Sequence, residues 1–122
     1  MTPKQEWRSI GPLSAIPQRG ARRLGFGIDT KPIAVFRTAT DQLFAVIDEC
    51  PHRGGPLSEG IVCGTTVTCP LHHWVIDLSD GVAVPPDEGA TMTIPIRVID
   101  GEVFIEMPRH MPGTGQGGAG ER

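Results

Sequence analysis

The sequence contains no hydrophobic run that approaches the roughly 18 apolar residues of a membrane-spanning helix. Its first residues also lack the charged and then apolar stretch of a secretory signal peptide. We therefore expect a soluble, cytoplasmic protein that does not bind membranes. Only three cysteines are present, and three cannot all pair, so a scaffold held by disulfides is not expected.

Motifs of several enzyme classes are missing as well. The sequence has no recognisable Ser/His/Asp triad, paired carboxylates or phosphate-binding loop, and it has no internal repeat. Gly25-Phe26-Gly27 is too short for a dinucleotide fingerprint and lacks the helix that should follow one. We therefore expect no catalysis by this chain alone.

Turn-forming residues are abundant, with 16 glycines and 12 prolines in 122 residues. No long apolar stretch has a period of 3.6, which argues against a helical bundle, whereas threonine, valine and isoleucine favour strands. Asp100-Gly101 is the dipeptide most typical of a type I′ hairpin turn. The expected strands are Ala21–Phe26, Pro32–Thr38, Gln42–Ile47, Thr65–Thr68, Trp74–Leu78, Pro95–Ile99 and Glu102–Glu106.

These short strands predict an all-β fold, built as a small antiparallel sandwich or a partly open barrel. One domain is expected over residues 1–107. Residues 108–122 are rich in glycine and polar, so we expect a disordered tail there.

Charge is distributed unevenly along the chain. Residues 1–37 carry seven Lys/Arg against two Asp/Glu, whereas residues 38–106 carry two Lys/Arg against eleven Asp/Glu. An acidic central region argues against a nucleic-acid partner, because proteins that bind nucleic acids concentrate basic charge on one face. It is compatible with either a solvated surface or a surface that docks a basic protein.

Two segments combine cysteine and histidine at metal-binding spacings. Cys50 and His52 form a Cys-x-His pair, and Cys69 and His72 form a Cys-x-x-His pair, with sixteen residues between His52 and Cys69. Two thiolates and two imidazoles suit either a tetrahedral zinc ion or a two-iron cluster in which two histidines bind one iron. Gly54-Gly55 would let the backbone approach bridging sulfides closely, which favours the cluster.

The paired motifs on a small β domain resemble those of Rieske iron–sulfur proteins. Respiratory members carry an additional cysteine in each loop and a serine at the end of the second loop. This sequence has Gly55, Leu71 and Trp74 at those positions, so the loop disulfide and the hydroxyl are absent. The chain is therefore similar to the soluble branch, which has low reduction potentials.

Within that branch, the sequence resembles the small subunit of assimilatory NAD(P)H nitrite reductase. Asparagine is commoner than His73 at that position of the family. The matching segments are Ile33–Arg37, Cys50–Val62, Val67–Leu78 and Asp87–Gly89.

This resemblance implies a [2Fe–2S] cluster, with Cys50 and Cys69 on one iron and His52 and His72 on the other. It also implies a large partner subunit that holds FAD, a [4Fe–4S] cluster and sirohaem and reduces nitrite to ammonium. Two alternatives stay open. The chain could be the ferredoxin component of a ring-hydroxylating dioxygenase, or a zinc-stabilised interaction module without a redox role.

Three residues near the motifs have simpler interpretations. We expect Cys63 to be a small buried hydrophobe rather than a fifth ligand. His73 is expected on the surface, where it either contacts a partner or has no specific role. Trp74 is expected to anchor the second loop in the core.

Overall fold

The computed structural model describes residues 6–25, 31–51, 55–70 and 73–107. Within them the chain forms ten strands and two single 3-10 turns. The turns are η1 (Leu13–Ala15) and η2 (Leu57–Glu59). The strands are β1 (Glu6–Pro12), β2 (Gly20–Leu24), β3 (Ile33–Arg37), β4 (Leu43–Ile47), β5 (Ile61–Cys63), β6 (Thr66–Thr68), β7 (Val75–Asp77), β8 (Thr93–Ile94), β9 (Ile96–Ile99) and β10 (Glu102–Met107).

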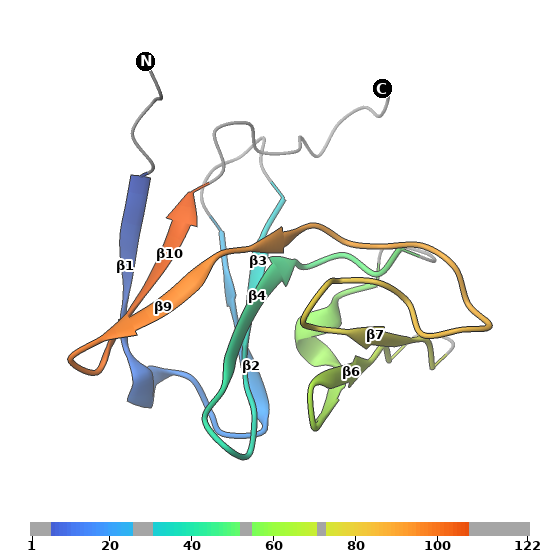
Figure 1. Cartoon of the computed structure of the whole chain (residues 1–122), viewed down its shortest axis with the longest axis horizontal. Helices are drawn as coiled ribbons and strands as arrows, with labels where there is room; N and C mark the ends of the chain where they lie inside the picture. Colours follow the sequence, from blue (N-terminus) through green and yellow to red (C-terminus); the bar gives the residue numbers. More distant parts are fainter. Residues whose placement is uncertain (1–5, 26–30, 52–54, 71–72, 108–122) are drawn as a thin grey trace.

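The strands form three antiparallel sheets that are not closed into a barrel. Their strand orders are β1-β10-β9, β2-β3-β4-β8 and β5-β6-β7. Figure 1 shows β1, β9 and β10 at one end of the molecule, β2 to β4 in the middle, and β6 and β7 at the other end. The predicted all-β antiparallel class is therefore confirmed. In the described part of the chain, no helix has the length and hydrophobicity needed to cross a bilayer.

The middle sheet separates two hydrophobic cores. Ala34 and Phe36 of β3 pack in the core shared with β6 and β7, whereas Ile33 and Val35 pack in the core shared with β1 and β10. Successive side chains of a strand point to opposite faces, so all four residues are buried. This is why the first four residues of β3 are all apolar rather than alternating.

The predicted hairpins are confirmed. β3 pairs with β4 from Ile33↔Ile47 to Arg37↔Leu43. Asp100 and Gly101 have φ angles of 52° and 81°, the two positive values that a type I′ turn requires, and they join β9 to β10.

Other predicted boundaries differ from the observed strands by one or two residues. β2 begins one residue early and ends at Leu24, while Phe26 lies outside the described residues. β1, β5 and β8 were not predicted as strands: β5 and β8 contain only three and two residues, too few to show a period. The predicted tail at 108–122 also lies outside the described residues.

Candidate metal centre

Two of the predicted ligands, Cys50 and Cys69, lie in the same hydrophobic core. Cys50 follows β4 and is 2% exposed, while Cys69 directly follows β6 and is 1% exposed. Both belong to the core between the middle sheet and the β5-β6-β7 sheet. Neither forms a disulfide. The fold therefore places two buried thiols in one apolar environment, although 18 residues lie between them in the sequence.

Each cysteine closes the base of a short loop. The Cys50 N–H donates to the Gly55 carbonyl at 2.8 Å, and the Cys69 N–H donates to the Trp74 carbonyl at 2.7 Å. These bonds hold the two ends of each loop together. The other predicted ligands, His52 and His72, belong to these loops but lie outside the described residues.

A buried carboxylate joins the two segments that flank the first loop. One Asp48 carboxylate oxygen accepts hydrogen bonds from the Ser58 N–H at 2.7 Å, and the other accepts from the Ser58 hydroxyl at 2.6 Å. Arg23 Nε lies 3.1 Å from the same carboxylate, whose side chain is 0% exposed. Sequence reasoning missed this contact. The only local signal was an acidic residue two positions before the Cys-Pro step.

Gly89, from a third segment of the chain, packs near a residue of each loop. Gly89 has a φ of +130°, and a Cβ added there would lie 2.9 Å from Pro51 Cβ and 4.0 Å from the Trp74 ring. Glycine is required because this backbone conformation and this close approach both exclude a side chain. Gly89 is thus packed against Pro51 of the first loop and beside Trp74 of the second.

Replacing Gly89 by alanine is expected to lower the free energy of unfolding by about 1–3 kcal/mol and to speed bleaching of the bound cluster. Strain at φ +130° and the clash with Pro51 both contribute. The matched control is Gly101→Ala, at φ +81° with nothing within 4 Å, which should cost about 1 kcal/mol and leave bleaching unchanged. Urea unfolding and the decay of visible absorption measure both effects. Equal bleaching of the two variants would contradict the role given to Gly89.

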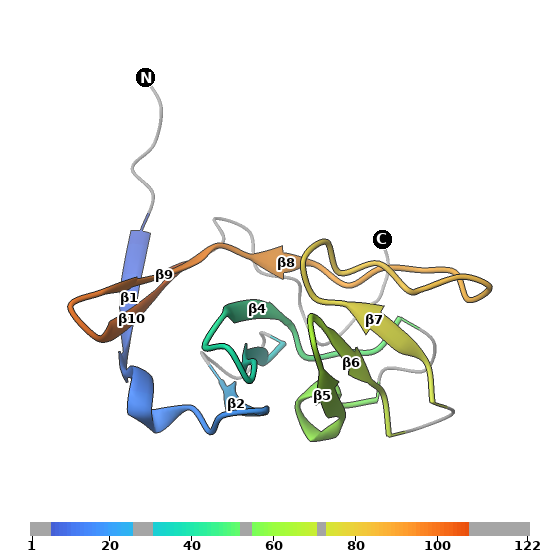
Figure 2. The same ribbon diagram turned by 60° about the horizontal axis from the view of Figure 1, so that its bottom comes forward.

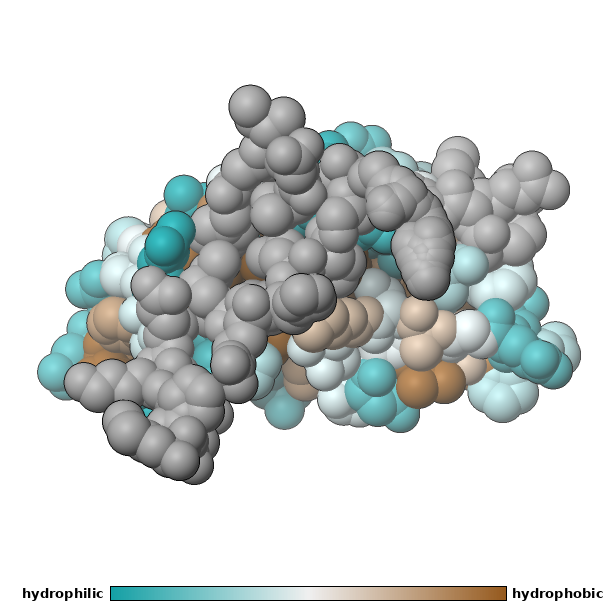
Figure 3. All heavy atoms as spheres, turned by 90° about the horizontal axis from the view of Figure 1, so that it is seen from above, coloured by the Kyte–Doolittle hydropathy of each residue, from teal (hydrophilic) through white to brown (hydrophobic). Residues whose placement is uncertain are grey.

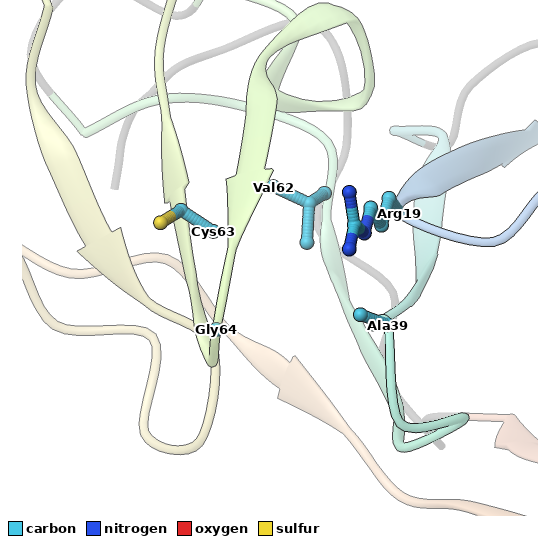
Figure 4. Close-up of a pocket in the computed structure, with 5 residues that line it drawn as sticks. All are labelled: Arg19, Ala39, Val62, Cys63 and Gly64. Carbon is cyan, nitrogen blue, oxygen red and sulfur yellow. The ribbon is translucent and has the colours of Figure 1, made fainter.

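The prediction that Cys63 is buried is wrong. Cys63 is exposed because it ends β5, an edge strand whose side chains alternate between solvent and the core. Cys63 and Arg19 both line a cavity of about 250 Å³, and Figure 4 shows the Cys63 sulfur pointing away from Arg19.

The expected positions of the last two residues of the second loop, on the surface and against the core, are confirmed. His73 is exposed, with a positive φ of 60°. Trp74 is half-buried and packs against the core that contains both cysteines.

The two buried thiols fit the cysteine half of the donor set that a [2Fe–2S] cluster with mixed ligands needs. Such a cluster takes two thiolates on one iron, and the apolar surroundings of Cys50 and Cys69 would shield that iron from water. Within the described ranges no three His, Cys, Asp or Glu side chains gather at one point. The histidine half of the predicted set lies outside those ranges.

Comparison with known proteins identifies the family. A family model for the Rieske [2Fe-2S] domain matches residues 6–95. The anthranilate 1,2-dioxygenase ferredoxin subunit of Burkholderia cepacia is 38% identical over 105 residues, which cover 84% of this chain and 93% of that protein.

Solved structures agree with this family. A chain in the complex of reduced oxygenase and oxidized ferredoxin in carbazole 1,9a-dioxygenase has a TM-score of 0.74 at 27% identity, covering 84% of this chain and 94% of that one. A proposed NADH-dependent nitrite reductase small subunit from Mycobacterium tuberculosis has a TM-score of 0.77 at 19% identity, covering 88% of this chain and 100% of that one. At that identity the second likeness concerns the fold alone. The chain therefore belongs to the family of Rieske [2Fe–2S] domains, and it is an electron-transfer protein that binds such a cluster rather than a zinc-stabilised module.

Proposed function

We propose that this chain is the Rieske small subunit of a cytoplasmic assimilatory NAD(P)H nitrite reductase. It would work beside a large subunit that carries FAD, a [4Fe–4S] cluster and sirohaem. The observation that carries this proposal is that residues of the segments resembling the nitrite reductase small subunit, Cys50–Val62 and Asp87–Gly89, form the surroundings of the two cysteines. Leu57 is fully buried in the core of the two cysteines, Ser58 binds Asp48, and Gly89 packs on Pro51.

We assign Cys50 and Cys69 as the thiolate ligands of one iron and His52 and His72 as the imidazole ligands of the other. When bound, the cluster supplies one-electron transfer. The chain's own residues hold it in place: the backbone bonds from Cys50 and Cys69 fix the loop bases, and Asp48 fixes the start of the first loop. The core around the two thiols excludes water from that side.

A second function is favoured by a specific observation. The 38% identity to a dioxygenase ferredoxin subunit extends over 84% of the chain. A dioxygenase ferredoxin would use the same chemistry as a nitrite reductase small subunit, since in both cases a single electron passes between protein partners. The alternatives differ only in which protein receives the electron.

The deciding experiment pairs the cluster-loaded chain with each kind of partner from the same genome. If the proposal holds, the chain co-purifies with the large sirohaem subunit and increases NAD(P)H-dependent formation of ammonium from nitrite. Binding to a terminal oxygenase, with electron delivery that supports hydroxylation and no association with the sirohaem subunit, would instead establish the dioxygenase function.

The reduction potential is expected near the low end of the Rieske range, at about −150 mV. Reduction adds a negative charge to a site with two thiolates, and Trp74 stands where a hydroxyl donor would stabilise that charge. Residues 38–106 carry eleven Asp or Glu against two Lys or Arg, and this acidic excess opposes the added negative charge. Redox titration followed by EPR measures the potential, and a clearly positive value would contradict this reasoning.

A further inference from the structure

The sheet β5-β6-β7 has one face in the core and one face in solvent. Register places Val62, Val67 and Ile76 opposite one another, and Val67 and Ile76 are fully buried. Because side chains alternate along each strand, the flanking residues point the other way. We call these residues the outer face: Ile61, Cys63, Thr66, Thr68, Val75, Asp77, Val82 and Val84. The last two join through backbone bonds to β7, from the Asp77 N–H to the Val82 carbonyl and from the Val84 N–H to the Val75 carbonyl.

The outer face carries three of the six exposed large hydrophobic side chains in the described part of the chain. Ile61 is 72% exposed, Val82 43% and Val84 37%. Ile61, Thr68, Val75 and Val84 form one row across the sheet, at the end nearest the second cysteine loop. Figure 2 shows the three strands side by side at one end of the molecule. Among the coloured atoms seen from above in Figure 3, brown ones occur in small patches among teal and white ones.

The border of the outer face is acidic beside β7, whereas at the β5 edge Arg19 lines a cavity together with Val62 and Cys63. Residues 54–96 contain five Asp or Glu and no Lys or Arg. Glu59 and Asp80 are exposed beside the face, and Asp77 lies on it. Hydrogen bonds from the Ser79 hydroxyl and N–H lower the pKa of Asp77 below its ordinary value, so this carboxylate stays charged.

We propose that the outer face is the surface by which the redox partner protein holds this domain, and that the partner presents an apolar patch bordered by Lys or Arg. This inference rests on the proposed function, because it names the surface that the large subunit would contact. An apolar centre with a charged border is typical of protein interfaces, and opposite charge on the partner would steer association.

A second copy of this chain fits the face less well. A two-fold dimer brings the same patch of each copy together, which would bring the acidic groups of one copy towards those of the other. A basic partner surface has no such cost. The face also begins at the base of the second cysteine loop, since Thr68 precedes Cys69 and Val75 follows Trp74, so a partner bound there lies beside that loop.

The test compares two exposed isoleucines in different sheets. Ile61 lies on the outer face, whereas Ile99 is 47% exposed on β9, at the opposite end of the molecule in Figure 1. In the cluster-loaded full chain, Ile61→Glu is expected to raise the Kd for the large subunit at least about tenfold, while Ile99→Glu leaves it within about twofold. Added salt should slow association of the wild-type chain.

A second measurement needs no substitution. Cys63 is exposed on the outer face, so it should react with a maleimide in the wild-type chain and be protected when the partner is bound. Peptide mass spectrometry separates its labelling from that of Cys50 and Cys69. Protection of Cys63 supports the proposal even if Ile61→Glu folds poorly.

The outcomes separate this proposal from the proposed function. If the wild-type chain binds only a terminal oxygenase, the nitrite reductase assignment fails, and the same two measurements are made with that oxygenase. Equal affinity of Ile61→Glu and wild type, or unchanged labelling of Cys63 in a formed complex, overturns the outer face as the interface. Concentration-dependent self-association that Ile61→Glu abolishes, or no binding to either partner, overturns it as well.

Discussion

Replacing Cys50 or Cys69 by serine is expected to remove most of the visible absorption and the EPR signal of the reduced protein. Each proposed ligand supplies a thiolate from a buried position, 2% and 1% exposed, and a serine hydroxyl there is a far weaker iron ligand at neutral pH. His52→Ala and His72→Ala should have a similar effect. Iron and acid-labile sulfide content, measured after anaerobic purification, gives the fraction of clusters retained.

The chain offers its own control in Cys63. It is exposed on β5 and belongs to neither cysteine loop, so Cys63→Ser should keep full iron content and an unchanged spectrum. A colourless Cys63→Ser protein, together with a Cys50→Ser protein that keeps its colour, would overturn the ligand assignment.

Asp48→Ala is expected to lower the free energy of unfolding of the chain by about 2–4 kcal/mol. The substitution leaves the Ser58 N–H and hydroxyl without their acceptor in a partly buried site, and it removes the tie across the first loop. The ion pair with Arg23 adds little, because that guanidinium is 55% exposed and screened by solvent. Urea denaturation of the cluster-loaded protein gives the change, and faster bleaching should accompany it.

Asp80→Ala is the matched control for Asp48→Ala. Asp80 also accepts a backbone hydrogen bond two residues ahead, from the Val82 N–H at 2.9 Å, but it is exposed. We expect a loss within about 1 kcal/mol and no change in bleaching. Similar losses for the two variants would show that burial of the Asp48 carboxylate does not matter.

Much of the fold could be predicted wherever the information is local. The β3–β4 hairpin consists of two runs of apolar residues, Ile33–Phe36 and Leu43–Ile47, and Asp100-Gly101 favours a type I′ turn by itself. β5 and β8 could not be predicted, because two or three residues show no periodicity and pair only once their neighbours are in place. Cys63 was misjudged for the same reason: Ile61–Cys63 is apolar in sequence, but its position at a sheet edge exposes two of its three residues.

The candidate site divides in the same way. The two cysteines could be proposed as ligands from the sequence, because their spacing from histidine and their adjacent prolines lie within a few residues. The Asp48 contacts were not, because Arg23 and Ser58 lie 25 residues before and 10 residues after it. The approach of Gly89 to Pro51 likewise depends on tertiary packing across 38 residues.

The burial of the two cysteines has a consequence for how the protein is made. If they are the ligands we propose, their sulfur atoms belong to the same packed core as Phe36 and Leu57, and a carrier protein could not reach them from solvent in the folded chain. Iron and sulfide would then have to be inserted before the two loops reach their folded conformation, or while both loops are open at the same time. Maturation of this protein would accordingly depend on the order of two events, and a nascent chain that folded first would be slow to mature.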